Sequence, residues 1–296
     1  MPLQRQFFVA ILAGLTACQP SPPDSQPVTG ESFEIPALSS VPVLDAPNLR
    51  EASGLAASRA NQNLLWALND GGSGAKVFLL GPDGKQRAEY QLEGATNRDW
   101  EDMASTEISG VKIVFAGDIG DNIDRNSTQS IYRFIEPVFT GATSGTIGQV
   151  VKIEFKYPDG SHNAETLLVD HQTKDLYIVT KQQTGARLYR LPYPQSTNGV
   201  ITAEAMGELP LNNLTAGDIS PDNKEVILRN YEEVLYWKRG SGESLAVTLK
   251  RSPIRLPYLR EPQGEGLAFA ADGSGYFTIG EVVEGIQPRL FFYKRK

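Results

Sequence analysis

The chain has 296 residues and a net charge of −7, with 35 Asp and Glu against 28 Lys and Arg. A negatively charged protein repels polyanions, which argues against nucleic-acid binding as the main function. The sequence has one cysteine and two histidines, which argues against a disulfide framework, a Cys-ligated zinc site and a Ser-His-Asp triad.

The N-terminal residues 1–18 have the order of a lipoprotein signal peptide. Arg5 is followed by an apolar run from Phe7 to Leu15, and Leu15-Thr16-Ala17-Cys18 is typical of a lipobox. The apolar run is too short to span a bilayer as a helix. The sequence therefore predicts lipidation of Cys18, although a buried N-terminal helix that ends in Ala-Cys is the alternative.

Residues 19–40 are rich in Pro, Ser and Gln, a composition typical of a disordered tether between a lipid anchor and a folded domain. Gln19 after the cysteine favours the outer membrane, by similarity to known lipoproteins. We therefore expect an extracytoplasmic, membrane-anchored protein whose domain occupies residues 41–296.

A repeated pattern organises this domain. Five segments combine polar or acidic residues, a small residue and an apolar pair, with starts 48 to 64 residues apart; they begin at Glu51, Asp99, Asn163, Thr215 and Gln263. Two further strand-like runs follow each segment. A fourth run appears in four units, at residues 88–92, 150–155, 201–209 and 245–249.

Four-stranded repeats of this length predict an all-β fold, a five-bladed β-propeller. The fifth repeat ends after its third strand, near residue 293. We expect Val41 to Leu44 to supply its outer strand and so to close the ring. Six blades and a β-sandwich are the alternatives.

Antiparallel geometry brings the start of each inner strand and the end of each second strand to the same end of a blade. One opening of the central channel should therefore collect polar side chains from every blade. These are Glu51, Asp70, Asp99, Glu101, Asp118, Asp121, Asn122, Glu165, Lys181, Asp218, Arg229, Glu265 and Glu281.

Crowded carboxylates need neutralisation. A hard cation such as Ca²⁺ is one solution, with candidate ligands Glu101, Asp118, Asp121, Asn122, Glu165, Asp218 and Glu265. A salt-bridge network is the other, with Arg50, Arg98, Lys181, Arg229 and Arg260 as its cations. Both remain open at this point.

The loop at residues 118–126 places five oxygen-bearing side chains within nine residues, which is compatible either with a local calcium loop or with a polar turn. We expect the two histidines, His162 and His171, to be solvated loop and turn residues, with His171 facing away from the acidic opening.

The repeats resemble those of a family of uncharacterised secreted β-propellers. The similarity rests on Gly117-Asp-Ile-Gly-Asp-Asn122, Asn163-Ala-Glu-Thr-Leu-Leu-Val-Asp170 and Gln263-Gly-Glu-Gly-Leu-Ala268, and covers most of residues 50–290. A more distant similarity, at Ser53-Gly-Leu-Ala56 and Glu265-Gly-Leu-Ala268, is to SdiA-regulated and phytase-like propellers. It implies calcium binding in some relatives and phosphoester hydrolysis in others.

Two functions follow as hypotheses. The first is a lipoprotein that binds a divalent cation, with Ca²⁺ favoured, and a small ligand or partner at the acidic opening. The alternative is a metal-dependent hydrolase of phosphoesters, in which Glu165 or Glu265 acts as the base while Lys181 and Arg229 stabilise developing charge. A purely structural role is a third possibility.

Overall fold

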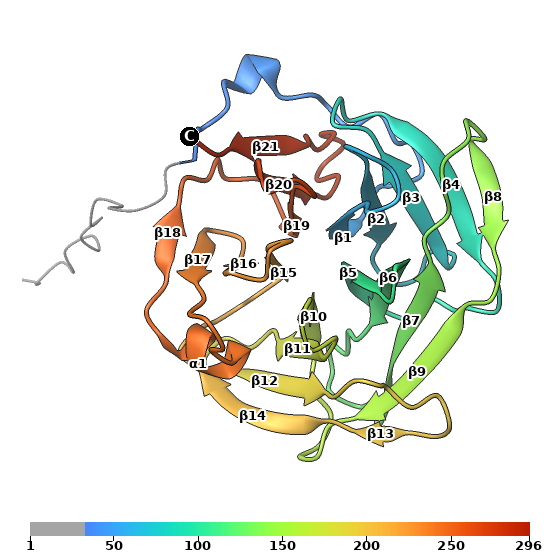
Figure 1. Ribbon diagram of the computed structural model, residues 1–296. Coiled ribbons are helices and arrows are strands. Elements are labelled where there is room, and N and C mark those ends of the chain that lie inside the picture. The colour runs from blue at the N-terminus through green and yellow to red at the C-terminus, as the bar shows by residue number, and fades with distance from the viewer. Residues whose placement is uncertain (1–32) are drawn as a thin grey trace, which may run out of the picture.

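The computed structural model describes residues 33–296, so the predicted signal peptide and the lipidation site Cys18 lie outside the described part of the chain. Five small sheets surround a central axis (Figure 1), which confirms the predicted five-bladed propeller. Within residues 33–296, no helix is both long and apolar enough to cross a membrane.

Each blade begins with its inner strand at the axis and continues outward. Blade 1 contains β1 (Ala52–Ala57), β2 (Leu65–Asn69), β3 (Lys76–Leu80), β4 (Gln86–Leu92) and β8 (Ser144–Ile147). Blade 2 contains β5 (Trp100–Ile108), β6 (Val111–Asp118), β7 (Gln129–Ile135), β9 (Val151–Lys156) and β13 (Ile201–Thr202). Blade 3 contains β10 (Ala164–Val169), β11 (Leu176–Thr180), β12 (Ala186–Leu191) and β14 (Glu204–Leu209). Blade 4 contains β15 (Ala216–Ile219), β16 (Glu225–Arg229), β17 (Val234–Lys238) and β18 (Ile254–Leu256), and blade 5 contains β19 (Gly264–Phe269), β20 (Gly275–Gly280) and β21 (Phe291–Lys294).

The N-terminal segment completes blade 5, as the sequence predicts. Val43 pairs with Arg289 and Phe33 pairs with Arg295, both antiparallel. The pairing stays limited to isolated bridges because Pro36 and Pro42 lack an N–H group and the short 3-10 helix η1 (Leu38–Ser40) lies between them. Residues 33–40 of the predicted tether thus contact the propeller.

One predicted strand is wrong. Residues 245–249 form most of the helix α1 (Leu245–Lys250) instead of the outer strand of blade 4. The Ser244 side chain accepts a hydrogen bond from the Val247 N–H group and caps the helix, which buries Leu245 and Leu249 against the core. The strand β18 takes the outer position in its place.

Two short strands tie neighbouring blades together at the periphery. The strand β8 leaves blade 2 and pairs in parallel with β4 of blade 1, and β13 leaves blade 3 and pairs in parallel with β9 of blade 2. The strand β8 accounts for the longer second repeat.

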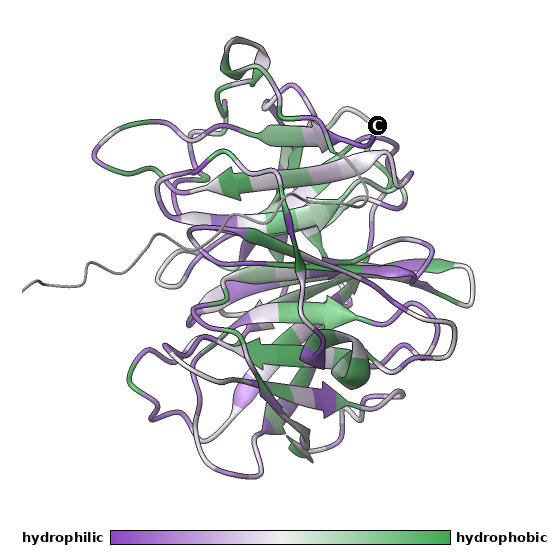
Figure 2. Cartoon of the chain, turned by 90° about the vertical axis from the view of Figure 1, so that its left-hand side faces the viewer, coloured by the Kyte–Doolittle hydropathy of each residue, from purple (hydrophilic) through white to green (hydrophobic). Residues whose placement is uncertain are grey.

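The core lies between successive blades. The inner strands β1, β10 and β19 are buried along their whole length because they contact both neighbours and the channel. Their Ala, Gly and Ser residues permit this crowding; a Cβ at Gly54 would lie 2.9 Å from the Asp102 Cα atom of the next blade. In the side view of Figure 2 the strands are largely hydrophobic and the connecting loops largely hydrophilic.

Candidate functional site

Acidic side chains meet at one end of the channel, where inner strands start and second strands end. Blade 1 contributes Asp70, blade 2 contributes Asp99 and Glu101, blade 3 contributes Glu165, and blade 5 contributes Glu265 and Glu281. These six residues are called the acidic opening. Its members act on one another electrostatically: Glu165, Asp70, Asp99 and Glu265 all raise the pKa of Glu101, although burial is the larger cause.

Three of these carboxyl groups form a tight trio. Oxygen atoms of Asp70, Asp99 and Glu101 lie within 4.8 Å of one another. Glu101 is only 3% exposed. Among residues 33–296, no ion pair joins any of the three to a Lys or Arg side chain, although the Arg98 guanidinium acts to lower the pKa of Asp99.

Two glycines leave the space that the trio occupies. A Cβ at Gly120 would overlap the Glu101 Oε1 atom and lie 2.5 Å from Asp99 Oδ2. A Cβ at Gly71 would lie 2.7 Å from Asp99 Oδ1. Neither glycine has a positive φ, so close contacts are the reason for glycine: with the carboxylates at Gly120, and with both the Asp99 carboxylate and the backbone of Arg98 and Asp99 at Gly71. This gives the Gly117-Asp-Ile-Gly-Asp-Asn122 segment a physical role in the site.

Burial and like charges disfavour ionisation of the trio. Burial raises the pKa of Asp70 to about 6, with the carboxylates of Asp99, Glu265 and Glu51 adding to the effect. Burial also raises the pKa of Asp99, and it raises that of Glu101 well above its usual range. These raised pKa values mean that the cluster resists full ionisation, which a bound cation would favour.

The other half of the opening is a hydrogen-bonded chain. The Lys181 Nζ atom lies 2.7 Å from Glu165 Oε2 and donates to the Tyr231 hydroxyl at 2.8 Å. That hydroxyl donates to Glu265 Oε1 at 2.9 Å. Tyr231 belongs to blade 4, so all five blades contribute to the site.

The pKa values in this half differ according to their partners. Burial raises the pKa of Glu165 to about 7 even though Lys181 acts to lower it. Burial acts to lower the pKa of Lys181, but Glu165 and Tyr231 outweigh it, so Lys181 stays charged. Burial and the neighbouring Glu265 raise the pKa of Glu281 to about 8.

The structure gives the loop at residues 118–126 a bonding role of its own. Asp118 Oδ1 accepts a hydrogen bond from the Asp99 N–H group at 2.9 Å. Asp121 accepts hydrogen bonds from both the backbone and the side chain of Asn126. Asn122 accepts one from the Asn163 side chain at 3.2 Å. These hydrogen bonds hold a turn and connect it to blade 3.

Asp218 lies inside the channel instead of at the opening. Its carboxylate accepts hydrogen bonds from the N–H groups of Ile219 and of Phe269 in blade 5. Asp102, which the sequence analysis did not single out, is similar: its Oδ2 atom accepts from the Leu167 N–H group of blade 3 at 2.9 Å. Both carboxylates connect neighbouring inner strands.

Arg229 does not reach the opening. Its side chain is fully buried between blades 4 and 5, where Nη1 lies 3.1 Å from Glu261 Oε2 and Nη2 donates to the Tyr258 hydroxyl. It also donates to the backbone carbonyl of Gly266 at 3.0 Å. The guanidinium therefore lies away from the position predicted for stabilising substrate charge.

The salt-bridge alternative fits only part of the acidic opening. Arg98 lies 3.7 Å from Asp118, and Arg260 lies 3.6 Å from the exposed Glu232. Of the five predicted cations, Lys181 is the one whose ion pair, among those of the described residues, involves a carboxylate of the opening.

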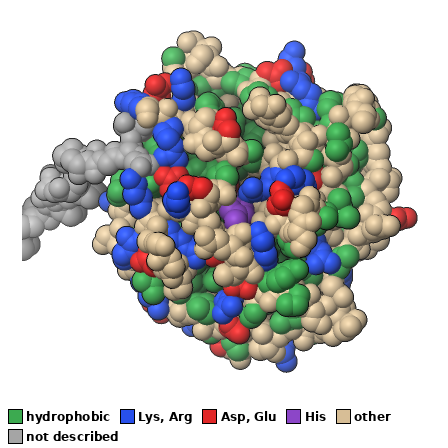
Figure 3. All heavy atoms as spheres, in the orientation of Figure 1, with side chains coloured by type: hydrophobic (Ala, Val, Ile, Leu, Met, Phe, Trp, Pro, Cys, Tyr) green, Lys and Arg blue, Asp and Glu red, His purple; other side chains and the backbone are tan. Residues whose placement is uncertain are grey.

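The opposite end of the channel is closed by His171 and Arg59. His171 contacts Arg59 of blade 1 and Thr106 of blade 2, each at 3.1 Å. Burial, reinforced by Arg59, lowers the pKa of His171 to about 3. It faces away from the acidic opening, as expected, but it is not a solvated turn residue. Figure 3 shows a histidine at the centre of this face, with basic and acidic side chains around it.

His162 is not solvated either. It is 8% exposed and stacks on Tyr189, with ring centroids 5.6 Å apart. Its Nε2 atom lies 3.2 Å from Asp159 Oδ1.

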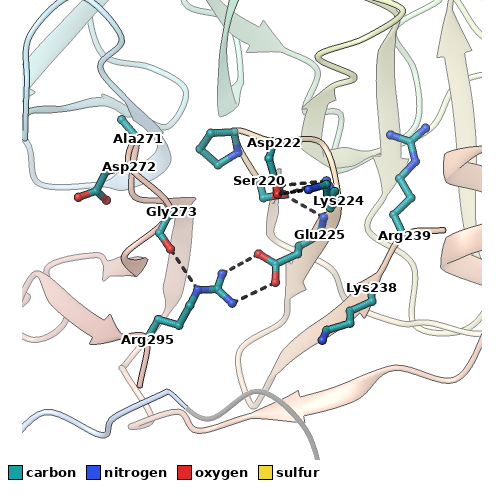
Figure 4. A pocket seen from close by; sticks show the side chains of 11 residues that line it. Ser220, Asp222, Lys224, Glu225, Lys238, Arg239, Ala271, Asp272, Gly273 and Arg295 are labelled. Atoms are coloured by element: carbon teal, nitrogen blue, oxygen red, sulfur yellow. Dashed lines mark hydrogen bonds and ion pairs between the residues drawn. The ribbon is translucent and has the colours of Figure 1, made fainter. Parts of the chain in front are cut away.

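A cavity of about 540 Å³ lies between the hairpins of blades 4 and 5. Figure 4 shows Arg295 pointing toward Glu225, with two hydrogen bonds between them. Arg239 lies 2.6 Å from Asp170, and Lys224 lies 3.4 Å from Asp222. Because most of its charged groups already take part in ion pairs, this cavity is a weaker candidate than the acidic opening.

Comparisons with known proteins leave the family unassigned. No family model and no curated protein matches the sequence. Among solved structures, hydrazine synthase of Kuenenia stuttgartiensis is 12% identical with a TM-score of 0.41, and the match covers 77% of this chain and 61% of that chain. A chain of the nidogen/laminin complex is 8% identical with a TM-score of 0.42, covering 78% and 73% of the two chains. The chain thus spans less than two thirds of the hydrazine synthase chain, and no functional residue is carried over from either protein.

Proposed function

We propose that this protein is an extracytoplasmic lipoprotein whose acidic opening binds a divalent cation, with Ca²⁺ favoured, together with a small ligand. The observation that carries the proposal is the trio of Asp70, Asp99 and Glu101, whose oxygens lie within 4.8 Å of one another. Two oxygens bound to one Ca²⁺ at about 2.3–2.6 Å are separated by at most about 5 Å. The spacing of the trio is therefore compatible with one shared ion.

The chemistry of the trio favours Ca²⁺ over softer metals. Its donors are carboxylate oxygens, which hard cations prefer, and they come from two segments, one with Asp70 and one with Asp99 and Glu101, an arrangement that suits the irregular geometry tolerated by Ca²⁺. Glu165 and Glu265 lie around the same opening and add negative potential. Asp118, Asp121, Asn122 and Asp218, predicted as ligands, are engaged elsewhere and are left out of the proposed site.

The lipoprotein part of the proposal rests on the order of Arg5, the apolar run and Cys18 in the sequence, together with the resemblance to secreted propellers. Lipid attachment would hold the propeller at a membrane without a spanning helix. Replacement of Cys18 with Ala should move the protein from the membrane fraction to the soluble fraction and abolish incorporation of radiolabelled palmitate. Unchanged fractionation and labelling would refute the anchor.

The metal site is tested by thermal unfolding of metal-stripped protein that begins after Cys18. A ligand at 100 times its Kd stabilises the folded state by about 2.7 kcal/mol, which raises the Tm of a domain of this size by roughly 5–10 °C. Glu101→Gln and Asp99→Asn should each remove most of this rise. Asp272→Asn, a change at an exposed acid in a distant hairpin, should retain it. Absence of any Tm rise with Ca²⁺, Mg²⁺ or Mn²⁺ would refute the proposal.

One observation favours a hydrolase of phosphoesters as the second candidate. Glu165 combines a pKa of about 7 with a lysine at 2.7 Å, so a base suited to neutral pH lies beside a cation at the same opening. A bound metal would contribute Lewis acidity. Hydrolysis of p-nitrophenyl phosphate that requires Ca²⁺ and is lost in Glu165→Gln would support this function. If the wild-type protein shows no turnover, the hydrolase function is refuted and the binding function remains.

A further inference from the structure

A cavity of about 190 Å³ lies beside the acidic opening, and Glu281 belongs to both. Glu281 follows the second strand of blade 5, and the cavity extends from it toward the N-terminal segment that closes the ring. The volume is below the range of about 300–1,000 Å³ found for drug-sized ligands. The cavity therefore suits a small molecule.

The walls of the cavity are apolar. Leu38 of the N-terminal segment, Ile286 and Pro288 of the following loop and Phe291 of β21 line it. Leu38 and Ile286 are 57% and 64% exposed, so two large apolar side chains border the cavity while remaining accessible to water. An apolar group placed between them would remove this surface from water.

Charged groups of both signs complete the lining. Glu281 lies at the end near the opening, and Arg260 and Arg289 contribute positive charge. Glu261 also lines the cavity, but the buried Arg229 neutralises it. Arg289 donates to the backbone carbonyl of Val41 through Nη1, and Arg260 is 74% exposed with a long 3.6 Å contact to Glu232. Both guanidinium groups keep donors for a ligand.

We propose that this cavity binds a small zwitterion of the α-amino-acid type, with its apolar side chain between Leu38 and Ile286, its ammonium group at Glu281 and its carboxylate at Arg260 and Arg289. The inference rests on the proposed function, because it names the chemical class of the small ligand at the acidic opening.

This class matches all parts of the lining at once. A hydrocarbon would make no use of the charged groups of Glu281 and the two arginines. A simple amine would encounter the positive charge of Arg260 and Arg289, and a simple carboxylate would bring no cation to Glu281, whose pKa, raised to about 8, means that it ionises more readily beside one. A molecule with opposite charges on adjacent groups offers its cation to Glu281 and its anion to Arg260 and Arg289.

The test is isothermal titration of the metal-stripped soluble protein with L-leucine, isoamylamine and 4-methylpentanoate. The last two have the same apolar group but lack the carboxylate and the amine, respectively. We expect L-leucine to bind and each analogue to bind at least about tenfold more weakly, a difference of about 1.4 kcal/mol. No binding of L-leucine, or equal binding of an analogue, would overturn the proposal.

Variants locate the site. Glu281→Gln should weaken L-leucine binding about tenfold without weakening 4-methylpentanoate, and Ile286→Ala should weaken all three compounds. Because Ile286 is 64% exposed, its substitution leaves the core unchanged and keeps the test valid if Glu281→Gln fails to fold. Binding that is insensitive to Ile286→Ala would place the ligand elsewhere and contradict the proposal.

The outcome is separable from that of the cation site. Glu101→Gln should abolish the Tm rise with Ca²⁺ and leave L-leucine binding to metal-stripped protein intact. Failure of Ca²⁺ to stabilise the wild-type protein would refute the metal site, whereas failure of L-leucine to bind would refute only the ligand class.

Discussion

The Nζ atom of Lys181 lies 2.7 Å from the Oε2 atom of Glu165, and this ion pair divides the acidic opening into two unlike halves. On the side of blades 3 to 5, the lysine neutralises part of the carboxylate charge and connects to Tyr231. On the side of blades 1 and 2, the trio of Asp70, Asp99 and Glu101 has no such ion pair among the described residues. A cation bound at the trio would therefore gain more electrostatic stabilisation than a cation bound near Lys181.

Removal of the lysine should destabilise the fold. Glu165 is 5% exposed in its side chain, so Lys181→Met leaves a buried carboxylate without its partner. Loss of one member of a buried pair costs about 3–5 kcal/mol; because Lys181 is 21% exposed, we expect the lower end of that range. Urea unfolding measures the loss. The double variant Glu165→Gln, Lys181→Met should recover part of it, and equal stability of Lys181→Met and the wild type would contradict the prediction.

Substitution of Gly120 should damage the trio. The new methyl group in Gly120→Ala would overlap Glu101 Oε1, so the carboxylates must move apart. We expect the free energy of unfolding to fall by about 1–3 kcal/mol, as for other overpacked sites, and the Tm rise with Ca²⁺ to be smaller than in the wild type. Gly74→Ala is the matched control, because a Cβ there has no neighbour closer than 3.8 Å and φ is not positive. If both variants respond alike to Ca²⁺, the glycine does not shape the site.

The stability of the metal-stripped protein should fall as the pH rises from 6.5 to 8.5. Burial raises the pKa of Glu165 to about 7, so the folded state binds more protons than the unfolded state in this window and loses them as the pH rises. The contribution of Glu165 is about 1 kcal/mol, or a fall in Tm of roughly 2–4 °C. Glu281 acts in the same direction.

Asp170, whose pKa is lowered, is ionised throughout this window. His171 is neutral in the folded state because its pKa is lowered to about 3, whereas the unfolded chain still binds protons at this residue near pH 6.5, so His171 opposes the fall in stability by about 0.4 kcal/mol. Glu165→Gln should reduce the fall in Tm with pH, while the raised pKa values of Glu281 and Asp218 preserve part of it. A Tm that rises between pH 6.5 and 8.5 without metal would show that the carboxyl groups are already neutralised.

Glu136 should be critical for the contact between blades 1 and 2. Its carboxylate accepts hydrogen bonds from the Trp66 Nε1–H group at 2.8 Å, from the N–H groups of Arg59 and Ala60, and from the Ser58 hydroxyl. In Glu136→Gln an amide N–H group faces these donors and cannot accept their hydrogen bonds. We therefore expect the free energy of unfolding to fall by about 2–4 kcal/mol. The control Glu204→Gln, at an exposed residue with a long 3.3 Å ion pair, should stay within about 0.5 kcal/mol of the wild type by urea unfolding.

The repeat pattern predicted most of the fold because strand ends and turn residues recur at similar offsets in each unit. The strands β4 and β9 coincide with the predicted residues 88–92 and 150–155 to within two residues at each end. Residues 245–249 were mispredicted because their local pattern is compatible with either element, and the cap at Ser244 and burial of Leu245 select the helix. The parallel pairing of β8 and β13 depends on a neighbouring blade, which a single repeat does not encode.

For the site, the backbone position was predictable and the hydrogen-bonding partners were not. Glu101, Glu165 and Glu265 meet at the opening because their places at the start of inner strands follow from the repeat. Arg229 has an equivalent place at the end of a second strand, yet Glu261 draws its side chain between the blades. Nothing in the sequence around Tyr231 indicates its role, because that role depends on two hydrogen bonds to residues of other blades.

The bridge between Val43 and Arg289 makes blade 5 the mechanical junction of the molecule. A pull on the chain ahead of Phe33 would be transmitted first to the few contacts that seal the ring, before any other blade experiences force. The bridge between Phe33 and Arg295 would be loaded first, and the region bearing Leu38 beside Glu281 would be loaded next.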